Sequence, residues 1–146
     1  MVSYGFKGKG ITLHVLVDTY GKWLSFHITS ANAVEWRQAE WLVKDIRRAT
    51  GLLPKIIQGD KGYDCEQLRL QMSYKFGMGT AFPKRKNNLD QRGGKPVNRY
   101  VVERFFAHLH NGFRRMADCW EKLLSVRVGF THAAFLRYWL KQGIVG

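Results

Sequence analysis

Acidic residues are scarce in this chain. Only 11 of the 146 residues are Asp or Glu, whereas 24 are Lys or Arg, which gives a formal net charge of +13. The isoelectric point lies near 10.1. Such an excess of positive charge makes nucleic acid the leading class of partner and leaves a membrane surface as the rival.

Cysteines and long apolar runs are scarce as well. Cys65 and Cys119 lie in different segments and form no CxxC pair, so a disulfide framework or a zinc site has little support. No apolar stretch approaches the roughly 20 residues that span a bilayer, and residues 1–7 lack the apolar core of a signal peptide. We therefore expect a cytoplasmic protein without membrane association.

The remaining composition is that of a globular domain. The chain is 45% hydrophobic and 14% aromatic, which is enough to build a core at this length. Apolar residues alternate over residues 11–17 and 23–29, with Leu24 among those expected on the apolar side, and they predict two antiparallel strands. Residues 18–22 have turn chemistry, so Asp18 is better explained by the turn than by catalysis.

Helical periodicity follows the predicted hairpin. One helix is expected from a cap at Asn32 to about Ala49, and a second from a cap at Asp64 to Gly77. Their apolar residues recur three or four positions apart, as on the buried face of a helix.

Shorter apolar runs and a basic segment complete the pattern. A buried strand is expected over residues 55–59 and another short strand over residues 79–83. Residues 84–95 are basic, rich in Gly and poor in apolar residues, which is typical of an exposed loop. Helices are expected from about Asn98 and through residues 130–139, the latter burying Leu136 and Trp139 against the sheet. The order predicts one layered α/β or α+β domain over residues 1–146.

Two carboxylates are candidates for chemistry. Asp60 follows the strand predicted over residues 55–59, and the glycines at 59 and 62 would let a metal ion or a phosphate approach closely. A surface turn explains the same residues. Glu103 lies in a helical segment, and an ion pair with Arg99 four residues earlier, worth about 0.2–0.5 kcal/mol, accounts for it equally well.

Basic residues around these acids are candidates for phosphate contacts. Runs of charge are usually solvated faces, but the net charge favours a nucleic-acid role with little base specificity, because no recognition motif is present. The candidate DNA-binding residues are Lys84, Arg85, Lys86, Arg92, Lys95, Arg114 and Arg115.

Several short motifs occur in a diagnostic order. Together they resemble the catalytic domain of bacterial insertion-sequence transposases of the IS5/IS4 type, and the resemblance extends over nearly the whole chain. The motifs lie at residues 4–10, 13–18, 29–32, 59–64, 83–85, 102–106, 114–115 and 120–122.

The resemblance implies an RNase H-like α/β fold, in which helices flank a mixed sheet, and the DDE mechanism. In this mechanism three carboxylates hold two Mg²⁺ or Mn²⁺ ions, which activate a water or a 3′-hydroxyl for attack on DNA. Asp60 corresponds to the second acid and Glu103 to the third. Arg99 matches the arginine of the Tyr-Arg-Glu-Lys signature around the last acid.

The sequence departs from this family pattern in three places. Pro96 occupies the tyrosine position of the signature, and His110 occupies the lysine position. The family's first aspartate lies on a strand upstream of the segment at residues 7–10, and Asp18 does not match it. We therefore expect the first strand to be missing and the chain to be inactive alone.

The resemblance implies DNA as the partner, at transposon ends and target sites, together with a second copy or a full-length transposase. Two other functions stay open. The chain could be a basic DNA-binding remnant without catalysis, such as an inhibitor of transposition. A self-contained RNase H-like nuclease would need a first acid that the chain lacks.

Overall fold

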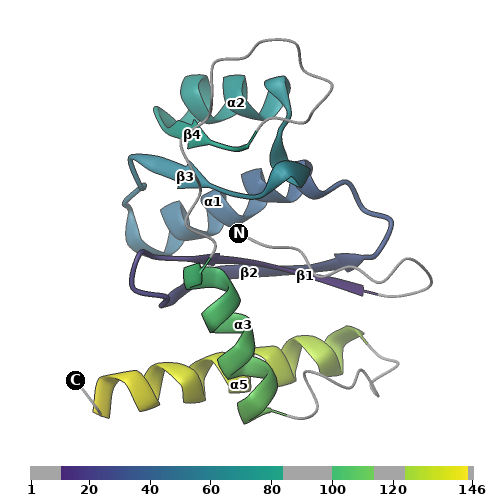
Figure 1. The fold of residues 1–146 in the computed structure, drawn as a ribbon, viewed down its shortest axis with the longest axis vertical. Coiled ribbons are helices and arrows are strands. Elements are labelled where there is room, and N and C mark those ends of the chain that lie inside the picture. The colour runs from purple at the N-terminus through teal and green to yellow at the C-terminus, as the bar shows by residue number, and fades with distance from the viewer. Residues whose placement is uncertain (1–10, 84–99, 114–123, 145–146) are drawn as a thin grey trace.

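The hairpin of β1 (Ile11–Val17) and β2 (Trp23–Ser30) forms the centre of the fold. The structure, a computed structural model, describes residues 11–83, 100–113 and 124–144. Figure 1 shows helices on both sides of this hairpin. After β2 the elements are α1 (Glu35–Thr50), β3 (Ile56–Gln58), the 3₁₀ helix η1 (Lys61–Tyr63), α2 (Glu66–Phe76), β4 (Gly79–Ala81), α3 (Tyr100–Gly112) and α5 (Leu124–Ile144).

The turn of the hairpin is held by Asp18. Its Oδ1 accepts hydrogen bonds from the backbone N–H of Tyr20 at 2.9 Å and of Lys22 at 2.8 Å. Gly21 has a φ of 87°, in the region that favours glycine. The prediction that Asp18 serves the turn is confirmed.

A bulge in β2 changes which side chains face the core. Leu16 pairs with Ser25 and Val17 pairs with Trp23, so Leu24 is the extra residue between two paired positions. The prediction that Leu24 lies on the apolar face is wrong, because the bulge turns its side chain outward, where it is 37% exposed. Trp23 packs against the core instead.

Each face of β1 belongs to a different core, since successive side chains of a strand point to opposite sides. Leu16 joins the first core with residues of α1, β3, η1 and α2, and Val15 joins the second core with α3 and α5. The first core consists of Leu16, Ala39, Leu42, Val43, Ile46, Ile57, Tyr63, Leu68, Met72, Met78 and Phe82. The second consists of Val15, Val102, Phe105, Phe106, Leu109, Ala134, Phe135 and Tyr138.

The helix starts differ from those predicted. α1 begins at Glu35 after Val34, and no side chain caps it, so Asn32 is not its cap. α2 begins at Glu66 after Cys65, again without a side-chain cap. Asp64 does not cap α2, because its carboxylate accepts a charge-assisted hydrogen bond from Arg69 at 2.6 Å.

The ends of α1 and α2 and the reduced state of Cys65 agree with the predictions from the sequence. Gly51 and Gly77 end α1 and α2 with left-handed φ values of 70° and 63°. Leu68 and Met72 are fully buried on the predicted face of α2. Cys65 carries a free thiol, and Cys119 lies outside the described residues.

The α/β architecture is confirmed, but the strands do not form one sheet. In the described ranges β1 and β2 form an antiparallel pair, whereas β3 and β4 form a separate parallel pair. The strand predicted over residues 55–59 is present but only partly buried. Ile57 is 2% exposed, whereas its neighbour Ile56 is 59% exposed because only one face of this short sheet meets the first core.

α5 covers the hairpin with a face offset from the predicted one. Phe135 and Tyr138 are buried, whereas Leu136 is 61% exposed and Trp139 is 42% exposed. The indole N–H of Trp23 donates to the carbonyl of Phe135 at 3.1 Å, which fixes the rotation of the helix. Neither α5 nor another helix in the described ranges is long and apolar enough to cross a membrane.

Candidate carboxylate site

Asp60 lies in the tight turn between β3 and η1. Its Oδ1 accepts a hydrogen bond from the backbone N–H of Gly62 at 2.9 Å, and its side chain is partly buried. The turn packs closely on the first core. A Cβ at Gly59 would lie 3.0 Å from the ring of Phe82 and 3.2 Å from the ring of Tyr63. The backbone and one carboxylate oxygen of Asp60 are therefore held in place.

A second carboxylate comes from the first turn of α1. A Cβ added at Gly62 would overlap the Glu35 carboxylate and would lie 3.0 Å from Oδ1 of Asp60. Glu35 and Asp60 thus converge on the same small space beside Gly62. Sequence reasoning missed Glu35 as a site residue, because its spacing from Asp60 follows no local pattern and only the tertiary fold brings the two together.

A buried pair of side chains lies beneath this turn. Tyr63 is fully buried, and its hydroxyl forms a hydrogen bond of 3.2 Å with Nδ1 of His14. Nε2 of His14 forms a second hydrogen bond, of 2.9 Å, with Oγ1 of Thr29. The turn that carries Asp60 is thereby attached to the central hairpin.

The buried pair is neutral at physiological pH. Burial raises the pKa of Tyr63 above its usual value, and the nearby charges of Glu35 and Asp60 raise it further. Burial, with a smaller contribution from His27, lowers the pKa of His14 to about 4. Tyr63 and His14 therefore form an uncharged, hydrogen-bonded pair.

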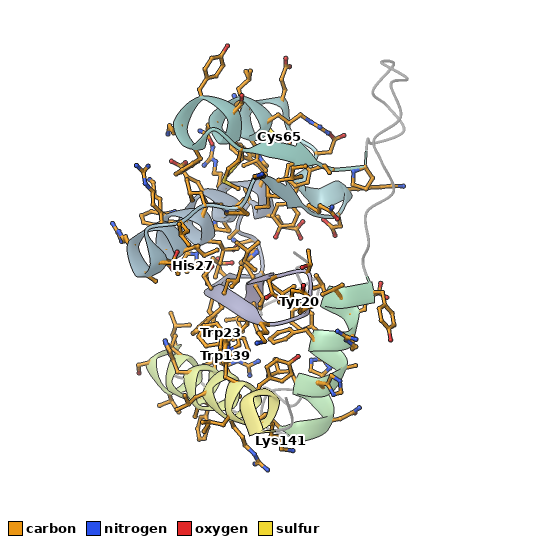
Figure 2. All side chains as sticks on the ribbon, turned by 90° about the vertical axis from the view of Figure 1, so that its left-hand side faces the viewer. Tyr20, Trp23, His27, Cys65, Trp139 and Lys141 are labelled. Carbon is orange, nitrogen blue, oxygen red and sulfur yellow. The ribbon has the colours of Figure 1, made fainter. Side chains whose placement is uncertain are left out.

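Glu103 lies in the first turn of α3, a helix that packs on the second core. Its side chain is exposed, between the buried Val102 and the exposed Arg104. Arg104 donates to the carbonyl of Tyr20 at 3.0 Å, which attaches the first turn of α3 to the hairpin turn. In Figure 2 Tyr20 lies beside α3, far from Cys65 in the layer above the hairpin.

The pairing of Glu103 with Asp60 stays a prediction. The two acids come from different elements, Asp60 from the turn between β3 and η1 and Glu103 from α3. The other predicted site residues lie outside the described residues, namely Arg99, Lys84, Arg85, Lys86, Arg92, Lys95, Arg114 and Arg115.

The oxygen donors beside Gly62 suit a divalent cation of the hard type. Mg²⁺ in proteins is commonly held by one or two carboxylates together with waters and substrate phosphates, and Mn²⁺ accepts the same ligands. Asp60 and Glu35 supply two such carboxylates. The described parts of the chain contain no group of three or more Asp, Glu, His or Cys residues that could hold a metal ion. The pair fits part of a metal site, and further ligands must come from elsewhere.

Comparison with known proteins gives the family. A protein of Burkholderia cepacia named "Putative transposase for insertion sequence element IS402" is 31% identical over 130 residues, which cover 85% of this chain and 57% of that protein. The chain thus spans little more than half the length of this relative. No solved structure matches the chain. The transposase DDE domain family matches residues 3–139, as the order of motifs predicts. The chain belongs to the transposase DDE domain family.

Proposed function

We propose that this chain binds DNA and takes part in metal-dependent cleavage and transfer of DNA strands during transposition of an insertion sequence. The observation that carries the proposal is the position of Asp60, which lies in a rigid turn after β3 with Oδ1 held by Gly62. The family and the net charge of +13 support DNA as the substrate.

Each site residue then has a defined role. Bound Mg²⁺ or Mn²⁺, two ions in the complete enzyme, would activate the attacking water or 3′-hydroxyl and neutralise charge at the phosphodiester. Asp60 and Glu103 hold metal, and Arg99 orients Glu103. The hydrogen bond from Gly62 keeps the Asp60 carboxylate in one orientation, as a metal ligand requires. The basic residues of segment 84–95, with Arg114 and Arg115, hold the phosphate backbone.

We also propose that the two strand pairs belong to one RNase H-like sheet. Within the described residues β1 pairs with β2 alone and β3 pairs with β4 alone, so each pair has an edge to which a further strand could add. A strand between β1 and β3 would carry the first aspartate of the family. Without it we expect metal binding but no strand cleavage.

A non-catalytic DNA-binding remnant, acting as an inhibitor of transposition, is the second candidate. It is favoured by one observation, namely that the described residues contain no three-ligand metal group. The two functions differ in whether Asp60 binds metal.

Titration with Mn²⁺ tests the proposal, with the free ion measured by electron paramagnetic resonance. We expect Asp60→Asn to weaken Mn²⁺ binding about ten-fold or more, because it removes a charged ligand. Asp45→Asn is the control, since Asp45 is an exposed acid of α1 and its loss changes the net charge equally. Equal affinities of the two variants would leave the DNA-binding remnant as the function.

Cleavage of supercoiled DNA in Mg²⁺ is the companion measurement. We expect none from the 146-residue chain alone. Nicking that Asp60→Asn abolishes would instead identify a self-contained nuclease and would remove the requirement for a further strand.

A further inference from the structure

We infer that Glu35 is a metal ligand that acts with Asp60 on the same divalent cation. The inference rests on the proposed function and adds to it a carboxylate that the family's three acids do not include. Glu35 comes from the start of α1, and the Asp60 turn brings the two side chains together beside Gly62.

Gly62 provides the space in which the carboxylates meet. Among the described residues, the glycines with a left-handed φ are Gly21, Gly51 and Gly77, so the φ of Gly62 lies outside this region. The backbone at Gly62 therefore does not require glycine. What excludes a side chain there is the Glu35 carboxylate, with Oδ1 of Asp60 3.0 Å from the same position.

The position of Glu35 brings a favourable and an unfavourable electrostatic interaction. An acid in the first turn of α1 is favoured by about 0.3–1 kcal/mol. Placing it beside a second carboxylate costs energy, because like charges repel. A divalent cation between them would reverse the sign of that interaction.

The attachment of the Asp60 turn to the hairpin supports the same assignment. Tyr63 directly follows Gly62 in the chain, and its hydroxyl is bonded to the buried His14 at 3.2 Å. Ligands that rest on a fixed, hydrogen-bonded layer keep the geometry that metal binding requires. The turn that carries Gly62, where the two acids meet, is thus fixed to the hairpin.

Glu35→Gln is the direct test, again by Mn²⁺ titration of the full chain. We expect its dissociation constant to rise about ten-fold or more, whereas Asp45→Asn on the same helix changes it less than about two-fold. Circular dichroism of each variant verifies that the fold is retained.

Gly62→Ala separates position from charge. The new methyl group would displace the Glu35 carboxylate, which can swing away because it ends a flexible side chain. We expect this variant to weaken Mn²⁺ binding by about the same factor as Glu35→Gln, although no charge is lost. Gly129→Ala is the matched control, since nothing lies within 4 Å of a Cβ at Gly129. The double variant Glu35→Gln/Gly62→Ala should bind no more weakly than Glu35→Gln.

The outcomes distinguish this inference from the proposed function. If Asp60→Asn weakens Mn²⁺ binding while Glu35→Gln and Gly62→Ala match their controls, Glu35 is not a ligand and the proposed function stands. If Asp60→Asn has no effect either, the metal site itself is wrong. An additive loss in the double variant also overturns the role of Glu35, because the two changes would then act independently.

Discussion

At the scale of single residues, His14 is the clearest case of a side chain held in an unusual state. It lies on β1, is fully buried and is bonded to Tyr63, and its pKa is lowered to about 4. In the unfolded chain a histidine titrates near about 6.5. Between these values the unfolded state binds more protons, so the folded state loses stability as the pH falls from about 6.5 to about 4.

We expect His14 to make its full contribution to the free energy of unfolding above about pH 6.5. This contribution should fall as the pH is lowered towards about 4 and should stay constant below that pH. Urea denaturation of the wild type and of His14→Gln across this range measures it. The variant should be less stable at neutral pH but should lose less stability on acidification. His132→Gln, an exposed histidine of α5, is the control. Parallel pH profiles for His14→Gln and the wild type would contradict the assignment.

The residues that sequence could place are those whose partners are local. Asp18 bonds Tyr20 and Lys22, both within four positions, and its turn role follows from residue type. The bond between His14 and Tyr63 spans 49 positions, and Glu35 reaches Asp60 through the packing of α1 on η1. No spacing rule predicts such contacts, so the roles of His14 and Glu35 could not be predicted from the sequence.

At the scale of elements, α5 shows how strongly one face of a helix can be fixed by aromatic contacts. The centroid of the Phe135 ring lies 4.9 Å from the ring centroid of Trp23, 5.0 Å from that of Phe26 and 5.4 Å from that of Phe105. We expect Phe135→Ala to lower the free energy of unfolding by about 3–5 kcal/mol, because it leaves a cavity in the second core.

Leu136→Ala is the matched control for this prediction. Leu136 is the next residue in the chain and is 61% exposed, so its truncation should change stability by no more than about 0.5 kcal/mol. Chemical denaturation followed by circular dichroism measures both variants. Similar losses of stability would place the buried face of α5 elsewhere.

Element types were predictable, but their faces and caps were less so. Long periodic segments predicted α1 and α2, and alternation predicted β1 and β2. The face of α5 was mispredicted because apolar residues occur all around this helix, with Leu136 and Trp139 among the exposed ones. The Asp64 cap failed because Arg69, a charged partner, competes for the carboxylate.

At the scale of the whole molecule, the positive charge should govern DNA binding. Removing one cation that neutralises a phosphate should flatten the dependence of log affinity on log salt concentration by about 0.9. Replacing both Lys84 and Arg85 with Ala should therefore reduce the slope by about 1.8. The double variant Arg47→Ala/Arg48→Ala removes the same charge from the exposed end of α1 and is the control.

Fluorescence anisotropy of labelled duplex DNA at several salt concentrations measures these slopes. A control slope as flat as that of the Lys84/Arg85 variant would show that total charge decides binding. In that case residues 84–95 would have no special role as a DNA-binding segment.

At this scale the order of short motifs predicted the family, and the order of predicted strands and helices predicted a layered α/β or α+β domain. The single mixed sheet was not found in the described residues, where β1 and β3 belong to separate pairs. Sequence periodicity indicates that a strand forms but not which strand it pairs with, since pairing depends on contacts distant in sequence. The RNase H-like sheet stays a prediction for the same reason.

The division of β1 between two cores has an evolutionary consequence. His14 and Val15 share a peptide bond, yet His14 supports the Asp60 turn and Val15 packs on α3 and α5. A change of volume under Val15 shifts the backbone that carries His14, since close-packed interiors transmit strain. Substitutions that accumulate in α3 and α5 can therefore move the carboxylates of Asp60 and Glu35, while every residue that touches these carboxylates stays the same.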